Sequence, residues 1–409
     1  MVRSLILLTL AVGGCAPRPQ PATIQPANGG ARQPYHSARY QVAEYVGPGR
    51  EDPPPQDIRE VKIGWFGPTD PNHPTAGLMW LAATLAVEEA NQAGGYRGLP
   101  FRLLPAWSEN PWDTGVAAVT RLAYEEGVWA IAGAPDGPSA HLVAQVVAKA
   151  RLTLISSVSS DPTTNRANVP WVFSCAPSYR MQAPALAEAL VSCSEGGAVA
   201  VVSGTDHDSR TLSAELLAAL AGPHVFPAAH LEFHAAGVDF DEHLRILREA
   251  NPAAIALLAG PQDSARFLRA LRQSGMDVPA VGGPAMAGRA FIDAAGDSAK
   301  GAVFPCLWDP VAGGEAAGTF ARSFEARFGR EPDCTAAYTY DALRLLIAAI
   351  RQSGLNRALI RDAVRNWSPG MGVTGTIEWN ALGQNEHAVG LGTIQEGRLI
   401  PLGRSPAHP

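Results

Sequence analysis

The chain has 409 residues, which is enough for two or three domains. Its composition is that of an ordinary globular protein, with 46% hydrophobic and 17% charged residues. The net charge of −6 gives no basic surface for a nucleic acid, and no apolar run after residue 20 is long enough to span a bilayer.

The first 15 residues, MVRSLILLTLAVGGC, have the features of a secretory signal: one arginine, an apolar run, small residues and a cysteine. Their end, Val-Gly-Gly-Cys, resembles the lipobox of bacterial lipoproteins, in which the signal is cut before the cysteine and the cysteine is lipidated. We therefore expect a lipid anchor at Cys15 and an extracytoplasmic location, in the periplasm or at the cell surface. A soluble signal that happens to contain a cysteine is the alternative.

Residues 16–60 include PRPQPATIQPANGG and EDPPPQ and offer little apolar material to bury. Proline also keeps a chain extended. This composition predicts a Pro-rich, disordered tether, which suits a folded domain that an acylated cysteine holds off a membrane.

From Val61 onward, short apolar strands alternate with amphipathic helices. In one clear unit, strands at 129–132 and 152–156 flank a helix that starts near Ser139, an N-cap type of residue. This strand–helix–strand unit implies a parallel sheet. Similar patterns predict strands at 61–67, 101–107, 198–202, 230–237, 253–260 and 278–283, and helices at 76–93, 114–126, 179–193, 212–220, 240–249, 263–274, 317–328, 335–353 and 357–367.

The loops at 133–138 and 156–162 leave the carboxyl ends of two parallel strands, where open α/β sheets place their ligands. Repeated βα units over this length indicate an α/β fold with two doubly wound sheets. We therefore expect a ligand cleft around these two loops.

Several segments together resemble the type I periplasmic binding proteins, specifically the leucine/isoleucine/valine-binding branch that serves branched-chain amino acid ABC transporters. The resemblance covers residues 61–402 and rests on the order and spacing of the segments. They are VKIGWFGP, LAVEEANQAGGYRG, VWAIAGAPDGPSAHLVAQVV, LISSVSSDP, WVFSCAPS, VDFDEHL, NPAAIALLAGPQDSARFLRALRQSG, FGREPDCTAAYTYDALRLL and GVTGTIEWNALGQN.

The resemblance implies two Rossmann-like α/β lobes that are joined by three hinge crossovers and close on a solute. The crossovers are expected near residues 175–178, 306–308 and 388–392. The first lobe would comprise residues 61–177 and 307–388, and the second 178–306 and 389–409. Members of the family are not enzymes and use no cofactor; they present a bound solute to a membrane permease.

In amino-acid-binding relatives, a Ser-Ser pair and backbone N–H groups at a helix N-terminus hold the ligand α-carboxylate. The matching residues here are Asp136 and Gly137. This departure matters because a carboxylate repels a ligand carboxylate in a desolvated cleft. The next loop keeps hydroxyls at Ser157, Ser159 and Ser160, which match the family's ligand-binding turn; ordinary turn chemistry is the alternative.

In the second lobe, Asp208 lies where relatives often have a tyrosine, and Asp263 matches the acid that holds the ligand ammonium. Asp263 also starts a predicted helix, so an N-cap is its alternative role. Trp308, at a crossover, can cover the ligand or pack the hinge. If Asp136 and these two acids face one cleft, they suit a cation better than the family's usual amino acid or small amide, unless one acid turns to solvent or pairs with Arg210.

Other chemistry has little support in the sequence. His230 and His234 would lie about 13 Å apart on one strand, so we interpret them as surface residues and expect no metal site. No nucleophile elbow, phosphate loop or zinc-protease motif occurs, so an enzyme is not expected. Cys306 and Cys334 are the expected disulfide pair in an oxidising compartment, with free buried thiols as the alternative.

These observations predict a lipid-anchored, extracytoplasmic protein that captures a small polar solute and delivers it to an ABC-type permease. The solute would be an amino acid or a related amide or amine. A ligand-sensing or envelope-regulatory module with the same fold is the alternative, because a fold alone does not choose between these roles.

Overall fold

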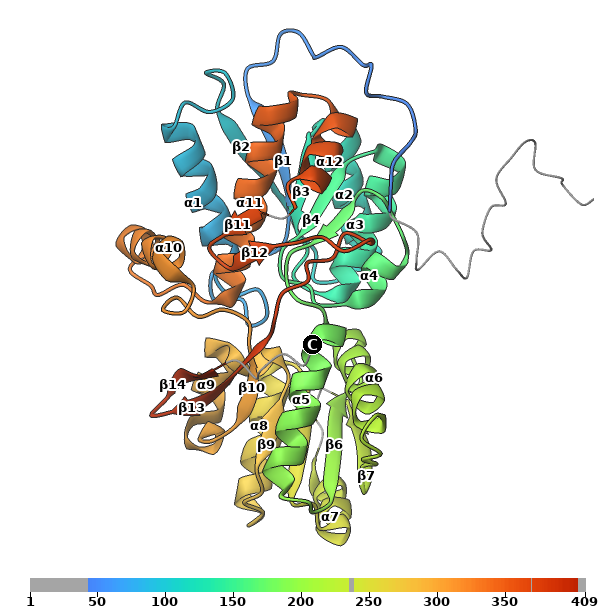
Figure 1. The fold of residues 1–409 in the computed structure, drawn as a ribbon, viewed down its shortest axis with the longest axis vertical. Helices are drawn as coiled ribbons and strands as arrows, with labels where there is room; N and C mark the ends of the chain where they lie inside the picture. The colour runs from blue at the N-terminus through green and yellow to red at the C-terminus, as the bar shows by residue number, and fades with distance from the viewer. Residues whose placement is uncertain (1–42, 235–238, 369, 404–409) are drawn as a thin grey trace, which may run out of the picture. The chain divides into compact units, whose positions relative to one another are not determined.

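The computed structural model describes residues 43–234, 239–368 and 370–403 (Figure 1). Arg39–Pro409 form one compact unit. Its described residues contain a five-stranded sheet, a seven-stranded sheet and a separate two-stranded hairpin. None of the helices described here is both long enough and apolar enough to cross a membrane. The expected signal and Cys15 lie outside the described residues.

The first lobe is built around the five-stranded sheet. Its strands are β1 (Val61–Phe66), β2 (Phe101–Ala106), β3 (Ala130–Gly133), β4 (Thr153–Ser156) and β5 (Val172–Ser174), and its helices are α1 (Met79–Gln92), α2 (Val116–Tyr124, after a π-helical turn at Pro111–Gly115), α3 (Gly137–Ala150), α4 (Pro162–Arg166), α10 (Gly314–Phe328), α11 (Cys334–Ser353) and α12 (Arg357–Asn366). The strands are parallel, in the order β2-β1-β3-β4-β5. Every residue of β3 and β4 is buried because helices cover both faces.

Alternate residues of this sheet point to opposite faces. Ala130 and Ala132 share a core with α1 and α11, whereas Ile131 shares one with α2 and α3. Figure 1 shows these helices grouped around the sheet. The apolar runs that predicted buried strands are therefore explained by two-sided packing.

The second lobe is built around the seven-stranded sheet. Its elements are α5 (Tyr179–Ser194), β6 (Val199–Gly204), α6 (His207–Ala221), β7 (Ala229–Phe233), α7 (Asp241–Ala250), β8 (Ala254–Leu258), α8 (Pro261–Gln273), β9 (Ala280–Gly282), α9 (Arg289–Ala295), β10 (Val303–Cys306), β13 (Gly390–Gln395) and β14 (Arg398–Gly403), with 3₁₀ turns at Pro284–Ala287 and Gly296–Ala299. The strand order is β14-β13-β10-β9-β8-β6-β7, and β13 and β14 run antiparallel to their neighbours. The two lobes give the α/β fold that the sequence predicts.

The chain passes between the two sheets three times. It does so between β5 and α5, between β10 and α10, and between β12 (Gly375–Ile377) and β13. These connections include or adjoin the segments expected to be crossovers. The hairpin of β11 (Gly370–Gly372) and β12 is attached to α11, because the Asp341 carboxylate accepts hydrogen bonds from the N–H groups of Val373 and Thr374 at 2.8 Å.

Residues 43–60, which we call the strap, pack against the first lobe. The Tyr45 and Trp171 rings lie 4.5 Å apart, centroid to centroid, and the buried Arg361 donates a hydrogen bond to the Ala43 carbonyl. Backbone carbonyls and one aromatic ring thus give the strap partners that its low apolar content did not suggest, and the disordered tether stays a prediction. Residues 16–42 lie outside the described residues.

Two helices begin earlier than predicted. Helix α3 begins at Gly137 rather than near Ser139, because the Asp136 carboxylate caps it and accepts a hydrogen bond from the Ser139 N–H at 2.8 Å. Helix α6 begins at His207 rather than at residue 212, with Asp206 as its N-cap. Both early starts place acidic and histidine side chains at the edge between the lobes.

Candidate functional site

A cavity of about 430 Å³ lies between the lobes, at the carboxyl ends of strands from both sheets. Loops after β3 and β4 line it from the first lobe, and loops after β6, β8 and β9 line it from the second. This volume falls within the range of small-molecule sites, roughly 300–1,000 Å³. Asp136, Asp208 and Asp263 all line the cavity, and its described lining includes no lysine or arginine.

The turn after β3 positions Asp136 and Gly137. Gly133 has a φ of +118°, and a Cβ there would lie 2.4 Å from the Phe66 carbonyl oxygen, so only glycine fits. Ala134 follows with a φ of +57°, which is uncommon outside glycine. This sharp turn leaves Asp136 at the cap of α3 and presents the Gly137 N–H at the helix N-terminus.

Asp208 reaches this N-terminus from the other lobe. Its Oδ2 accepts a hydrogen bond from the Gly137 N–H at 3.0 Å, whereas its Oδ1 is buried without a hydrogen-bond partner among the described residues. Burial, followed by the charge of Asp136, raises the pKa of Asp208 to about 7, although the Gly137 N–H acts in the opposite direction. A carboxylate of the second lobe thus occupies the N-terminus of α3.

Asp263 lies in the first turn of α8 and is not its N-cap, which is Gly260. Its Oδ1 accepts a hydrogen bond from the Arg266 side chain at 3.3 Å. Burial raises the pKa of Asp263, and the charge of Arg266 opposes this rise. Arg210 pairs with Glu232 at 2.9 Å instead of with a cavity acid. The structure therefore brings the three predicted acids together, and their role in binding stays a prediction.

The three predicted serines are placed differently. Ser160 lines the cavity, and its Oγ accepts a hydrogen bond from Gln182 Nε2 at 3.0 Å. Ser157 and Ser159 are buried and do not line the cavity. Ser159 Oγ accepts a long hydrogen bond, 3.4 Å, from the Asp161 N–H. Ser159 thus takes part in turn chemistry, the alternative that the sequence left open.

Trp308 packs in the hinge rather than over the cavity. Its Nε1 donates to the Val373 carbonyl at 3.1 Å, and its ring meets Phe320 edge-on with centroids 5.9 Å apart. The neighbouring Leu307 lines the cavity in its place.

The disulfide expected between Cys306 and Cys334 is not formed, because both residues are free thiols. The Cys306 thiol instead donates to the Trp308 carbonyl at 3.4 Å. Burial raises the pKa of both thiols, which keeps them protonated. Both cysteines are therefore free thiols, which is the alternative that the sequence left open.

A second polar cluster, which the sequence did not predict, joins the lobes beside the cavity. Asp161, the N-cap of α4, is buried, and its Oδ2 lies 3.0 Å from Nε2 of His141 and 2.8 Å from Nε2 of His207. His141 lies on α3 in the first lobe, and His207 begins α6 in the second. We call His141, Asp161 and His207 the interlobe triad.

The side chains of the interlobe triad shift one another's pKa values. Burial alone would raise the pKa of Asp161, but hydrogen bonds from His141, His207 and Thr163 hold it well below its usual range. Burial alone would lower the pKa of His207, but Asp161 raises it above its ordinary value. Asp161 therefore stays ionised and attracts positive charge between the lobes.

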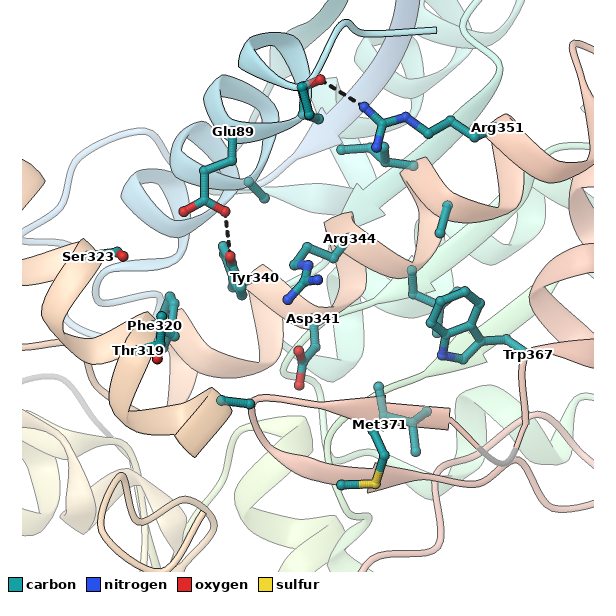
Figure 2. Close-up of a pocket in the computed structure, with 18 of the residues that line it drawn as sticks. Glu89, Thr319, Phe320, Ser323, Tyr340, Asp341, Arg344, Arg351, Trp367 and Met371 are labelled. Atoms are coloured by element: carbon teal, nitrogen blue, oxygen red, sulfur yellow. Dashed lines mark hydrogen bonds between the residues drawn. The ribbon is translucent and has the colours of Figure 1, made fainter. Parts of the chain in front are cut away.

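A larger cavity, of about 710 Å³, lies within the first lobe among α1, α10, α11 and the β11–β12 hairpin. Figure 2 shows two of its polar contacts: Tyr340 donates a hydrogen bond to Glu89, and Arg351 donates one to a backbone carbonyl of α1. Only the first lobe lines this cavity, and its described lining includes no residue from the loops that follow the strands of the five-stranded sheet. We therefore take the interlobe cavity as the candidate solute site.

Comparison with known proteins places this geometry in a family. Residues 60–398 match the profile of a family described as periplasmic binding protein. A search of curated proteins found no match.

Solved structures share the fold at low sequence identity. The branched-chain amino acid transporter substrate-binding protein LivJ from Streptococcus pneumoniae, in complex with isoleucine, is 20% identical with a TM-score of 0.76, over 84% of this chain and 99% of that one. The leucine-binding protein LivK from Thermotoga maritima is 20% identical with a TM-score of 0.76, over 85% of this chain and 99% of that one. A solute-binding protein from R. palustris in complex with benzoate is 18% identical with a TM-score of 0.74, over 84% of this chain and 96% of that one. Because the family profile spans most of the sequence, this chain belongs to the periplasmic binding protein family.

Proposed function

We propose that this chain is an extracytoplasmic solute-binding lipoprotein that captures a small, amine-bearing cation between its lobes and delivers it to an ABC-type permease. Family membership supports solute binding. The apolar N-terminal segment that ends in Cys15 supports secretion and lipid anchoring. The class of solute is argued from the interlobe cavity.

One contact, from the Gly137 N–H to the Asp208 carboxylate, supports this solute class most directly. In amino-acid-binding relatives, the equivalent helix N-terminus holds the solute carboxylate. A solute carboxylate would here have to displace Asp208 and then lie beside Asp136. Like charges are costly in a desolvated cleft, so a carboxylate-bearing solute is disfavoured.

The helices explain how several acids can line one cavity. Asp136 caps α3, and Asp208 and Asp263 lie in the first turns of α6 and α8. Helix N-termini stabilise carboxylates through their partial positive charge and their free N–H groups. Because these N-termini already have protein carboxylates, they offer a solute oxygen acceptors.

An ammonium or guanidinium group fits those acceptors. Such groups donate several hydrogen bonds and form strong, charge-assisted contacts with carboxylates. Asp136 would contact the solute from the first lobe, and Asp208 and Asp263 from the second. A solute held from both sides favours the closed arrangement of the hinge.

A thermal-shift experiment on the chain from residue 16 to 409, which keeps the strap, tests this proposal. The ligands are putrescine, agmatine and spermidine, compared with leucine, isoleucine, glutamate and benzoate. Binding to the folded state alone raises the melting temperature. We expect a rise with at least one amine that is lost in Asp208→Ala and kept in Asp277→Ala, an exposed acid of the same lobe. A rise with leucine or isoleucine alone would overturn the solute class.

Lipid anchoring and delivery need separate tests. We expect the chain in the membrane fraction of its host, and Cys15→Ser should release it or block its maturation. Deleting the gene should reduce uptake of the amine that the purified chain binds. A soluble wild-type chain would exclude the anchor, and unchanged uptake would exclude delivery to a permease.

Direct interlobe contacts favour one other role, a ligand-sensing or envelope-regulatory module with this fold. Besides the contacts of Asp208 and the interlobe triad, Arg166 on α4 pairs with Glu215 on α6 at 2.6 Å. Protein groups that hold the lobes together can set a resting closed state that a ligand modulates. Tight amine binding together with unchanged uptake would favour this role over transport.

A further inference from the structure

The interlobe triad gathers three metal-ligating atoms from three elements. One ligand atom from each of His141, Asp161 and His207 lies within 4.8 Å of the other two. Nε2 of His141 and Nε2 of His207 both contact Asp161 Oδ2. The two imidazole rings meet edge to face, with centroids 5.7 Å apart and an interplanar angle of 89°. Both nitrogens therefore approach the same carboxylate oxygen, one from each lobe.

Two imidazoles and one carboxylate form a ligand set that zinc commonly takes, with a fourth position left for water or a ligand. Around a tetrahedral ion with bonds of about 2.0–2.1 Å, the ligand atoms lie roughly 3.3 Å apart. The triad has separations of 3.0 and 2.8 Å from Asp161 to the two nitrogens, so small ring rotations would admit an ion. Nitrogen ligands also disfavour magnesium and calcium, which prefer oxygen.

The surroundings of Asp161 hold it in a ligating position. Its Oδ1 accepts hydrogen bonds from the Thr163 N–H and Oγ1, both at 2.8 Å. The Thr163 hydroxyl also lies 2.8 Å from Asp161 Oδ2 and 2.7 Å from His141 Nε2, so it would turn to Oδ1 when an ion binds. Hydrogen bonds of this kind orient metal ligands in proteins. The Asp161 side chain is fully buried, whereas the half-exposed imidazole of His207 leaves a path for an ion.

Neighbouring charge favours a cation. A Cβ on Gly137 would lie 2.9 Å from Asp161 Oδ2 and 2.8 Å from Asp208 Oδ1, so these two carboxylates approach the same point. Asp136 lies close enough for its charge to act on Asp208. No lysine or arginine is found in the described lining of the adjoining cavity.

We propose that the interlobe triad binds one divalent transition-metal ion, with zinc as the best match, and that this ion fastens the two lobes together. His141 and Asp161 supply ligands from the first lobe, and His207 supplies one from the second. The site lies at the edge of the solute cavity, which His207 also lines. The ion would thus control closure independently of the solute class.

Calorimetric titration with zinc chloride tests the site, using the chain from residue 16 to 409 without a histidine tag, freed of metal with EDTA and dialysed. No solute is added, so the result does not depend on the proposed function. We expect one zinc per chain. His141→Ala and His207→Ala should each weaken zinc binding at least tenfold, whereas His230→Ala, an exposed histidine of the second lobe, should leave it unchanged. Circular dichroism of each metal-free variant checks folding, and His141→Gln replaces His141→Ala if the latter does not fold.

Small-angle X-ray scattering tests the link between the lobes. Zinc should reduce the radius of gyration of the wild type and leave that of His207→Ala unchanged. Cobalt(II) in place of zinc should give the intense visible absorption of a tetrahedral site. Absence of stoichiometric zinc binding, or binding that His207→Ala leaves intact, would overturn the proposal. Zinc that binds without changing the radius of gyration would refute the fastening of the lobes.

Discussion

The Asp208 carboxylate of the second lobe accepts a hydrogen bond from the Gly137 backbone N–H of the first lobe at 3.0 Å. This contact sets an acid of one lobe on the helix N-terminus of the other, close to a second acid, Asp136. It joins the lobes, makes the cavity acidic and ties closure to the protonation of Asp208.

The stability of the metal-free chain should fall as the pH rises through about 7. The folded pKa of Asp208, about 7, exceeds its ordinary value of 3.8, so the folded chain holds a proton that the unfolded chain has lost. The stabilisation from this proton is complete below about pH 4 and disappears as the pH rises through 7. The raised pKa of His207 acts in the same direction. Asp161 stays ionised across this range.

The groups that face Asp208 are Asp136, Asp161, His207 and the Gly137 N–H. The charge of Asp208 in turn raises the pKa of Tyr179, which burial already raises.

Between pH 5.5 and 8 we expect the free energy of unfolding to fall by about 2 kcal/mol. Denaturant unfolding at each pH measures it. Asp208→Asn, which keeps an acceptor for the Gly137 N–H, should remove most of this dependence. A flat or rising profile in the wild type would contradict the account.

Gly137→Ala should separate the lobes without unfolding either one. A new Cβ would lie 2.8 Å from Asp208 Oδ1 and 2.9 Å from Asp161 Oδ2, so those side chains must move away. Scattering should show a larger radius of gyration. Gly318→Ala is the matched control, because only the flexible end of Arg322 lies near its Cβ, at 3.4 Å, and it should stabilise α10 by about 0.5–1 kcal/mol. Equal radii for both variants would be inconsistent with contact at Gly137.

Asp263→Ala should weaken binding of an amine-bearing solute at least tenfold, which corresponds to about 1.4 kcal/mol. The reason is the loss of one of the acids that line the cavity, because a cationic solute would lose a charge-assisted contact with the Asp263 carboxylate. Calorimetry of the amine found by thermal shift measures the change, with Asp277→Ala as the control. An unchanged affinity would remove Asp263 from the site.

Asn356→Ala should destabilise the first lobe by about 1–2 kcal/mol. Its Oδ1 caps α12 by accepting the Leu359 N–H at 3.0 Å, while its Nδ2 donates to the strap carbonyls of Gly49 and Asp52 at 2.6 and 3.2 Å. Thermal unfolding measures the lower stability, and proteolysis near residue 50 measures the release of the strap. Gln273→Ala, an exposed amide in the second lobe, should change stability by about 0.5 kcal/mol or less. Equal effects of the two substitutions would show that the strap is not held by Asn356.

The order of strands and helices could be predicted from the sequence because most elements have a strong local pattern. Strands such as β8 are apolar at every residue since both faces are covered, and this pattern is visible without the structure. The strap could not be predicted, because its partners, such as Trp171 and Arg361, lie far away in the sequence. Low apolar content indicates that a segment cannot fold alone, and it does not show that the segment lacks a surface to pack on.

The place of Asp136, Asp208 and Asp263 along one cavity could be predicted by matching the chain to family motifs, and their role in binding stays a prediction. The interlobe triad could not be predicted, because Asp161 lies 20 residues from His141 in the same lobe and 46 residues from His207, which only the hinge brings near. The one local signal, an acid before Pro162, predicts a helix N-cap, which Asp161 also is. Trp308 shows the opposite case, since its position at a crossover did not reveal which way its ring turns.

Calorimetric titration of agmatine and of leucine into the wild-type chain and into Asp208→Ala tests the central claim most directly. If the interlobe cavity selects an amine-bearing cation, agmatine binds the wild type, Asp208→Ala weakens that binding at least tenfold, and leucine gives no heat of binding. Tight leucine binding that Asp208→Ala leaves unchanged would contradict the account.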